Sequence, residues 1–397
     1  MSEKRRDNKN RILQTGEGQR KDGRYFYKYV DNCGKPQFIY SWKLTPNDCV
    51  PKGKRDDVSL REKEKAIQSD IEDGIDVSGR KMTVLELYEK YIRTHGNVKD
   101  SSAEGRETFI KRLRGDKLGN ALISALKPSD AKEWALRQRD KGLAFTTVNN
   151  DRRRLTAAFY MAVQDDLIRK NPFIFQLDTV IENDTEAKIP LSPEQEKSLL
   201  EFIKGSKVYG KYYNEFVIFL GTGLRVSELC GLTVKDVDME ERRVIVDHQL
   251  LKRAWKGFYI ETPKTSNGVR EIPMSPKVHE AFQRVLENHK DTGVTIDGYS
   301  NFLFCTGTGQ PKSAVGIAST FHRLAEKYNE CHEEEPLPKV FTPHVLRHTF
   351  CTNMANAGMN PKALQYIMGH KNITMTLNYY AHATYNSAKE EMERLTA

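Results

Sequence analysis

Six side chains in the C-terminal half of the chain are of types that could act together on a phosphodiester. The set contains two arginines, two histidines, one lysine and one tyrosine, and no carboxylate. Cationic side chains can stabilise the oxygens of a pentavalent phosphorus transition state without a metal ion. A tyrosine hydroxyl can attack the phosphorus as a covalent nucleophile. The six residues are Arg225, Lys264, His344, Arg347, His370 and Tyr379.

The local sequence predicts the elements that carry the first two of these residues. Residues 221–223 should end one helix, and Arg225 should stand where the next begins, a position that favours contact with a phosphate. A hairpin with strands at 258–261 and 269–272 is predicted, with Lys264 beside its tip. Each residue alone also has an ordinary interpretation, as an arginine that binds loop carbonyls or as a solvated surface lysine.

Two helices and a short third one should carry the other four residues. Thr342-Pro343 begins a helix on which His344 and Arg347, three positions apart, share one face. A second helix should end at the Gly-His pair that contains His370. A short helix with two adjacent tyrosines, Tyr379-Tyr380, is predicted to follow.

An alternative interpretation of the first of these helices is a zinc site. His344 and His348 lie four apart, a spacing that zinc ligands use on helices, and Cys351 is near. However, Arg347 lies between the two histidines, the glutamate base of a zinc protease motif is absent, and the arginine charge opposes that of a metal ion. We therefore predict neither a metal nor another cofactor for this chain.

The charge of the chain favours a polyanionic partner. Its 397 residues include 63 Lys and Arg against 54 Asp and Glu, which gives a net charge of +9. Residues 1–55 hold 14 basic and 6 acidic residues, so this segment alone contributes +8. A basic surface gains affinity for nucleic acid by releasing counterions. The alternative interpretation is a solvated tail that improves solubility.

The same segment shows the pattern of a small sheet. Aromatic residues alternate along 25–30, a turn follows at 31–34, and 38–42 continues the pattern, which predicts an antiparallel hairpin. A helix should then run from Ser59 to about Asp73. A small basic sheet with one helix suits contact with DNA. Its candidate DNA-contacting residues are Arg24, Tyr25, Lys28, Tyr40 and Lys43.

The chain should fold as three domains. Residues 1–75 form the basic α+β module, 82–175 an all-α domain, and 191–397 a mixed α+β, mainly helical domain, with a linker at 176–190. With 38% hydrophobic residues, a mostly disordered chain is excluded. No apolar run approaches the ~18 residues of a membrane span, and no secretory signal is recognisable. The six cysteines are scattered and are expected to be reduced thiols.

A long helix in the all-α domain carries a run of arginines. We expect Thr146-Thr147 to cap this helix and Asn171-Pro172 to follow its end. Three consecutive arginines cannot share one helix face, so at least one should point away from DNA. The arginines proposed to contact DNA are Arg152 and Arg153.

Taken together, these segments resemble the tyrosine recombinases, the phage integrase family. The family shows arginine, a lysine on a hairpin, His-x-x-Arg, histidine and tyrosine in this order. The same order spans about 155 residues here, from Arg225 to Tyr379. The all-α region is similar to the family's core-binding domain. With the basic N-terminal module, the whole chain resembles integrases of Gram-positive conjugative transposons.

Two tyrosines compete for the role of nucleophile. Members of the family commonly place the tyrosine nine residues after the histidine of the Gly-His pair, which selects Tyr379. A Tyr-x-His pattern is also frequent, and it selects Tyr380 before His382. On a helix the two side chains point about 100° apart, so only one can face a phosphate. We favour Tyr379.

The resemblance implies a site-specific DNA recombinase that needs neither metal nor ATP. Tyr379 would attack a DNA phosphodiester, form a 3′-phosphotyrosine and free a 5′-hydroxyl. Arg225 and Arg347 would hold the non-bridging oxygens, Lys264 would protonate the leaving oxygen, and the two histidines would assist. Two such exchanges would pass through a four-way junction and thereby excise or insert a mobile element.

The resemblance also implies partners. We expect double-stranded DNA with core-type and arm-type sites, a tetramer of the chain on that DNA, and an excisionase-type accessory protein. No membrane is expected, and the location would be the bacterial cytoplasm at the nucleoid. Residues 383–397 have the pattern of a short amphipathic helix that docks either on its own domain or on a neighbouring subunit.

Two alternatives belong to other classes of function. A DNA topoisomerase of the type IB kind uses similar chemistry but typically lacks a separate arm-binding module. A non-catalytic DNA-binding regulator would not need the complete set of catalytic residue types that the sequence contains.

Overall fold

The computed structural model describes residues 5–30, 34–72, 81–96, 100–186, 189–263, 268–380 and 392. The chain divides into two compact units, Met1–Glu186 and Ala187–Ala397. Within the described residues, the first unit has two separate hydrophobic cores and the second has one. No helix among these residues is both long and apolar enough to cross a bilayer.

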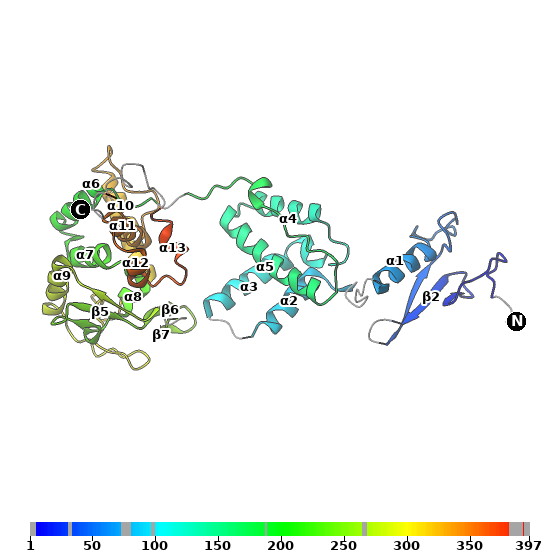
Figure 1. The fold of residues 1–397 in the computed structure, drawn as a ribbon, viewed down its shortest axis with the longest axis horizontal. Coiled ribbons are helices and arrows are strands. Elements are labelled where there is room, and N and C mark those ends of the chain that lie inside the picture. Colours follow the sequence, from blue (N-terminus) through cyan, green and yellow to red (C-terminus); the bar gives the residue numbers. More distant parts are fainter. Residues whose placement is uncertain are drawn as a thin grey trace. The chain divides into compact units, whose positions relative to one another are not determined.

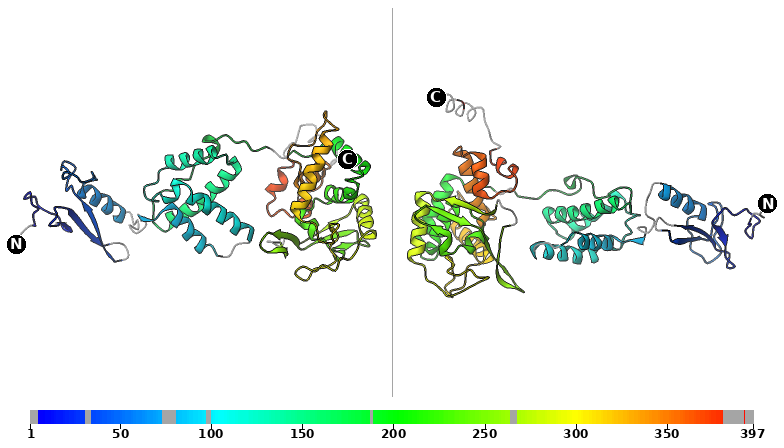
Figure 2. Two further views of the ribbon diagram at one scale, coloured as in Figure 1. Left: turned by 180° about the vertical axis from the view of Figure 1, so that it is seen from behind. Right: turned by 60° about the horizontal axis from the view of Figure 1, so that its bottom comes forward.

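The N-terminal part is a three-stranded antiparallel sheet with one helix (Figure 1). Its strands are β1 (Glu17–Gln19), β2 (Tyr25–Val30) and β3 (Pro36–Ser41), in that order, and its helix is α1 (Leu60–Glu72). Figure 2 shows α1 beside the sheet, where it contacts β2 and β3. The small core contains Leu13, Tyr25, Leu44 and Leu60. This is the α+β module that the sequence predicts.

Ionic contacts supplement this small core. Arg11 donates hydrogen bonds to Asp7 at 2.8 Å, to both oxygens of Asp48 at 2.8 and 3.0 Å, and to the Tyr25 hydroxyl at 2.9 Å. Burial alone would raise the pKa of Asp48, but hydrogen bonds from the Thr45 backbone and from Arg11 hold it well below its usual range. The network therefore fixes residues 7–11 against the sheet.

The described residues of the all-α domain include four α-helices, and its core surrounds Trp134, Phe159 and Phe173. Thr83 and Glu86 form a reciprocal capping box at the start of the first helix, with bonds of 2.8 and 3.2 Å. The helices are α2 (Val84–Thr94), α3 (Asp100–Arg114), α4 (Pro128–Asp140) and α5 (Phe145–Gln164).

The predicted bounds of the long helix are wrong at both ends. Helix α5 begins after Ala144, which makes no side-chain cap bond, so Thr146-Thr147 lies inside its first turn. It ends at Gln164, well before Asn171-Pro172. Asp166 explains the early end, because its φ of 52° is left-handed and cannot continue an α-helix.

The predicted linker also starts too early. Leu177 and Ile181 are buried in the core of the all-α domain. Asp184 accepts a hydrogen bond from the Phe145 backbone N–H at 3.2 Å and pairs with Arg139 at 2.6 Å. The ordered packing of this domain therefore continues to residue 184. Charged residues around two well-spaced apolar ones made the segment resemble a linker.

The second unit is built around helix α7, which packs against α6, α9 and α11 (Figure 1). Its strands form a three-stranded sheet, β4-β5-β8, and a two-stranded sheet, β6-β7. The helices are α6 (Pro193–Gly205), α7 (Tyr213–Thr222), α8 (Val226–Gly231), α9 (Pro276–Glu287), α10 (Ala314–Asn329), α11 (Pro343–Asn356), α12 (Pro361–Met368) and α13 (Thr374–Leu377). The strands are β4 (Val237–Asp238), β5 (Arg243–Val246), β6 (Gln249–Arg253), β7 (Gly257–Glu261) and β8 (Arg270–Pro273).

The predicted hairpin between 258–261 and 269–272 is wrong. Strand β7 pairs with β6, with Leu250 opposite Ile260, whereas β8 pairs with β5, with Val244 opposite Ile272. The error arose because β6 was not recognised. The turn that should hold Lys264, residues 264–267, lies outside the described residues.

Candidate active site

Arg225 lies at a sharp turn between two helices. Gly223 ends α7 with a φ of 63°, and a Cβ added there would lie 2.5 Å from Cδ1 of Phe350. A glycine is therefore required by both the backbone and the packing. Arg225 is the N-cap residue of α8, as the sequence predicts.

The Arg225 guanidinium already has two partners. Its Nη1 donates to Oε1 of Glu228 at 2.7 Å, and the Arg225 backbone N–H donates to Oε2 of the same carboxylate at 2.8 Å. Its Nη2 donates to the carbonyl of Gly369 at 3.1 Å. The side chain is 33% exposed, so one side of the guanidinium remains open to a ligand.

Arg347 approaches the same place from helix α11. It is only 6% exposed, and it donates to the carbonyls of Gly223 and Met368, each at 2.5 Å. Burial and the neighbouring Arg225 guanidinium lower the pKa of Arg347 to about 9, which leaves it charged at neutral pH. The two arginines thus bind consecutive carbonyls at the C-terminal end of α12.

His370 follows these carbonyls directly. Gly369, with a φ of 58°, ends α12, and His370 is 5% exposed with its Nδ1 3.0 Å from the hydroxyl of Thr376. Burial, and then the charges of Arg347 and Arg225, lower the pKa of His370 to about 4. Its imidazole is therefore neutral at pH 7 and can act through hydrogen bonding or as a base.

The two tyrosines have different surroundings. Helix α13 ends at Leu377, so both follow the predicted short helix instead of lying on it. The hydroxyl of Tyr380 donates to the carbonyl of Met359 at 2.6 Å. The ring of Tyr379 packs edge-on against His348, one residue after Arg347, with ring centres 4.7 Å apart. Burial raises the pKa of Tyr379, and the charge of Arg347 opposes this rise.

A cavity of about 300 Å³ brings part of the set together. Arg225 and His370 line it, as do Pro263 and Gly268, the described residues on either side of the Lys264 turn. Lys264 itself lies outside the described residues. His344 is exposed in the first turn of α11. The structure therefore groups Arg225, Arg347 and His370 closely, with Tyr379 against the same helix as Arg347.

Comparisons with known proteins show which family this chain belongs to. Residues 190–387 match the model of the phage integrase family, and residues 1–71 match the DNA binding domain of Tn916 integrase. The transposase from transposon Tn916 of Enterococcus faecalis is 57% identical over 396 residues, covering 100% of this chain and 97% of that protein. The transposase from transposon Tn1545 of Streptococcus pneumoniae has the same identity and coverage. The chain belongs to the phage integrase family.

A solved relative extends the likeness to three dimensions. The Tn1549 transposon integrase, residues 82–397, in complex with a circular intermediate DNA is 60% identical and superposes with a TM-score of 0.76. The match covers 79% of this chain and 99% of that one. This chain is thus a tyrosine recombinase, as the resemblance in its sequence implied, and the topoisomerase and regulator alternatives are set aside.

The residues of the N-terminal module that were predicted to contact DNA lie on two different faces of its sheet. Arg24, Lys28 and Tyr40 lie on the face away from α1, where the Arg24 guanidinium is 5.1 Å from the centre of the Tyr40 ring. Tyr25 is on the other face, 3% exposed, so its selection as a DNA contact is wrong. Lys43 is paired with Asp56 at 2.7 Å.

The consecutive arginines of α5 also differ in their surroundings. Arg152 donates to the carbonyls of Phe173 and Phe175 at 3.1 and 2.9 Å, so it holds the chain after the helix, and its contact with DNA stays a prediction. Arg153 is exposed. The sequence places Asn171-Pro172 after the helix but does not indicate that Phe173 and Phe175 return to Arg152.

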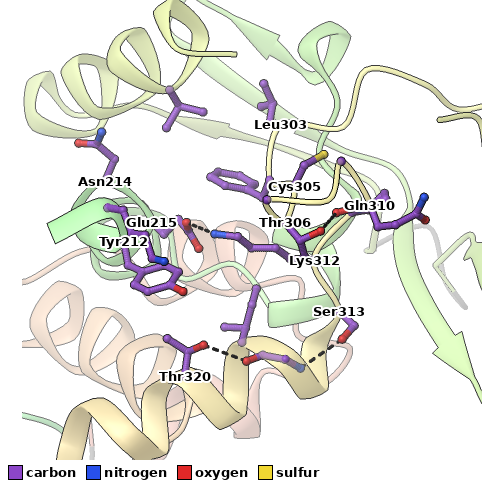
Figure 3. A pocket seen from close by; sticks show the side chains of 18 of the residues that line it. Tyr212, Asn214, Glu215, Leu303, Cys305, Thr306, Gln310, Lys312, Ser313 and Thr320 are labelled. Carbon is purple, nitrogen blue, oxygen red and sulfur yellow. Dashed lines mark hydrogen bonds and ion pairs between the residues drawn. The ribbon is translucent and has the colours of Figure 1, made fainter. Parts of the chain in front are cut away.

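A larger cavity lies elsewhere in this unit. It has a volume of about 1370 Å³, and Figure 3 shows Lys312 and Glu215 pointing toward one another within it as an ion pair. Burial raises the pKa of Glu215, although Lys312 opposes the rise. None of the five predicted catalytic residues that the structure describes lines this cavity.

Sequence reasoning missed the carboxylate of the site. Glu228 is 5% exposed and binds Arg225 through both oxygens. The Arg-x-x-Glu spacing at the start of a helix was the available signal. One group of possible metal ligands occurs among the described residues, Asp236, Asp247 and His248, but both ring nitrogens of His248 already contact Asp247 and the Gly231 carbonyl.

Proposed function

We propose that this recombinase excises and inserts a conjugative transposon through a 3′-phosphotyrosine intermediate. The family and its transposon-encoded relatives support this proposal. Among the solved complexes, the Tn1549 integrase carries R225K with circular intermediate DNA and Y379F with transposon right end DNA. The two substituted positions in that relative have the same residue numbers as Arg225 and Tyr379 of this chain.

Each residue of the set has a distinct proposed role. Arg225 and Arg347 stabilise the charge on the non-bridging oxygens, because both guanidinium groups are fixed at one end of α12. Neutral His370 donates a hydrogen bond or takes the proton of the attacking hydroxyl. Lys264 protonates the 5′-oxygen, and exposed His344, in the first turn of α11, assists.

Tyr379 is the proposed nucleophile. Its neighbour Tyr380 is tied to the Met359 carbonyl at 2.6 Å, which favours Tyr379 as the free hydroxyl. The attack forms the phosphotyrosine bond and breaks the bond to the 5′-oxygen, which leaves as a hydroxyl after protonation. The 5′-hydroxyl of a partner strand reverses the step, so the energy of the phosphodiester is conserved.

The other parts of the chain would supply DNA binding. The open face of the N-terminal sheet, with Arg24, Lys28 and Tyr40, is proposed to bind arm-type sites, and the all-α domain with Arg153 to bind core-type sites. A tetramer would perform both strand exchanges, an excisionase-type protein would set the direction, and the work would take place at the nucleoid.

The convergence of Arg225, Arg347 and His370 on the end of α12 is the observation that carries this proposal. A DNA duplex that spans the junction of the circular element and is nicked near the cleavage site tests the proposed function. The short fragment that carries the 5′-hydroxyl diffuses away after cleavage, so religation fails and the covalent adduct can be seen on a denaturing gel. Wild type and Tyr380→Phe should form the adduct, and Tyr379→Phe should not while still binding the duplex. An adduct lost in Tyr380→Phe instead would reassign the nucleophile.

A further inference from the structure

A third arginine lies close to Arg225 and Arg347, and it is completely buried. The side chain of Arg270, on strand β8, is 0% exposed. It binds Glu228 with two parallel bonds, Nη1 to Oε1 at 3.0 Å and Nη2 to Oε2 at 2.8 Å. Its Nε donates to the carbonyl of Ile367 at 2.6 Å, and Nη1 also donates to that of Gly268 at 3.2 Å. This side chain therefore cannot reach a DNA phosphate.

The three arginines share one structural support. Arg270 binds the carbonyl of Ile367, Arg347 that of Met368, and Arg225 that of Gly369. The last carbonyls of a helix lack partners within the helix, and the C-terminal end carries partial negative charge. Three guanidinium groups on three successive carbonyls therefore fix the turn that leads into the histidine of the site.

The charges around Glu228 show what the buried arginine adds. One carboxylate lies between two guanidinium groups, so the trio has a net charge of +1. Burial raises the pKa of Glu228, but hydrogen bonding and charge from Arg270, and then the charge of Arg225, lower it to about 2. Without Arg270, Arg225 would be the one guanidinium among the described residues bonded directly to the carboxylate, and the positive charge available to a phosphate would fall.

We propose that Arg270 is a positioning residue for strand cleavage, which neutralises Glu228 so that Arg225 keeps its charge for the phosphate, and which holds the Ile367–Gly369 turn. The inference rests on the proposed function, because it concerns the same cleavage site. It adds a residue that acts through Glu228 and Arg225 without contact with DNA.

The test measures single-turnover cleavage of the nicked duplex by the full chain. Arg270→Met keeps an unbranched side chain as far as the position of Nε and removes the charged guanidinium, and Arg243→Met, on the neighbouring strand β5 and 40% exposed, is the matched control. We expect Arg270→Met to bind DNA within about twofold of wild type and to cleave about 100-fold more slowly, as when one donor to a transition-state oxyanion is lost. Arg243→Met should cleave like wild type.

Two further measurements separate positioning from general damage. The double variant Glu228→Gln/Arg270→Met removes the carboxylate that would capture Arg225, so cleavage should recover about tenfold over Arg270→Met, one step of about 1.4 kcal/mol. A substrate with sulfur in place of the bridging 5′-oxygen needs no proton on its leaving group. It should not rescue Arg270→Met, since the loss concerns phosphate charge and not protonation by Lys264.

Several results would overturn the inference. They are cleavage by Arg270→Met within about threefold of wild type, no recovery in the double variant, or rescue by the sulfur substrate. If Arg270→Met does not fold, Arg270→Gln replaces it, because glutamine keeps a hydrogen-bond donor but carries no charge to neutralise Glu228. Wild-type cleavage by that variant would also refute the inference. Absence of any adduct with wild type would instead contradict the proposed function.

Discussion

Replacement of Gly223 by alanine should destabilise the fold in two ways, through backbone strain and through overpacking. The φ of 63° is left-handed, which costs a residue with a Cβ about 1–2 kcal/mol. The added methyl would also lie 2.5 Å from Cδ1 of Phe350 and 3.0 Å from Sδ of Met368. Overpacking of a well-packed core costs about 1–3 kcal/mol. We therefore expect Gly223→Ala to lower the unfolding free energy of the second unit by about 2–5 kcal/mol.

Two other glycines provide matched controls. Gly358 has a φ of 77° but open space around its would-be Cβ, so Gly358→Ala should cost only the backbone term of about 1–2 kcal/mol. Gly221 lies inside α7, where a Cβ would meet Cγ2 of Val278 at 2.2 Å without a positive φ. Gly221→Ala should therefore show the packing term, partly offset by the ~1 kcal/mol higher helix propensity of alanine.

Hydrogen exchange of peptides from α7 and α11 in the full chain measures these costs separately from the other domains. The order of destabilisation should be Gly223→Ala above both controls. Cleavage should also fall in Gly223→Ala, because the carbonyl of Gly223 accepts a bond from Arg347 at 2.5 Å. A loss of stability in Gly223→Ala no larger than in Gly358→Ala would refute the packing argument.

Four further outcomes are expected. Tyr380→Phe removes one hydrogen bond and should cost about 0.5–1.5 kcal/mol in unfolding free energy, measured by the same exchange, while retaining the covalent adduct. Because the folded pKa of His370 is lowered from 6.5 to about 4, the unfolded chain binds more protons between these values, and stability should fall as pH drops from about 6.5 towards 4. Melting temperatures across this range should show a weaker pH dependence for His370→Asn, and an unchanged slope would contradict the assignment. Lys28→Ala should weaken binding to arm-type DNA and reduce the slope of log affinity against log salt by about 1, which a titration at several salt concentrations checks. Tyr25→Phe should destabilise the N-terminal module to heat and leave that slope unchanged; a changed slope would return this tyrosine to the DNA contacts.

Motifs that combine a backbone requirement with a chemical group could be predicted from the sequence. The glycine turn before Arg225, the Thr-Pro start of α11 and the Gly-His end of α12 each follow local rules, and the structure shows all three. The order of the family's residues then pointed to the correct enzyme class. Local rules suffice here because each motif begins or ends a helix.

Contacts between distant segments could not be predicted in the same way. Nothing near Arg270 in the sequence indicates that it binds Glu228, 42 positions earlier, or the end of α12, 97 positions later. Arg152 appeared to be a surface cation because its partners lie 21 and 23 residues away. The pairing of β6 with β7 was missed because β-strand patterns predict strands better than partners.

The three separate hydrophobic cores have a consequence for how such chains change over generations. A module with its own core can be replaced by a different one without repacking the others, as long as the junction falls between cores. Exchange of the first 70 or so residues would change the DNA-binding module while the arginines that bind the end of α12, and the proposed nucleophile Tyr379, stayed as they are. DNA-target recognition and catalysis can therefore derive from different ancestral genes, which suits a gene carried on a mobile element.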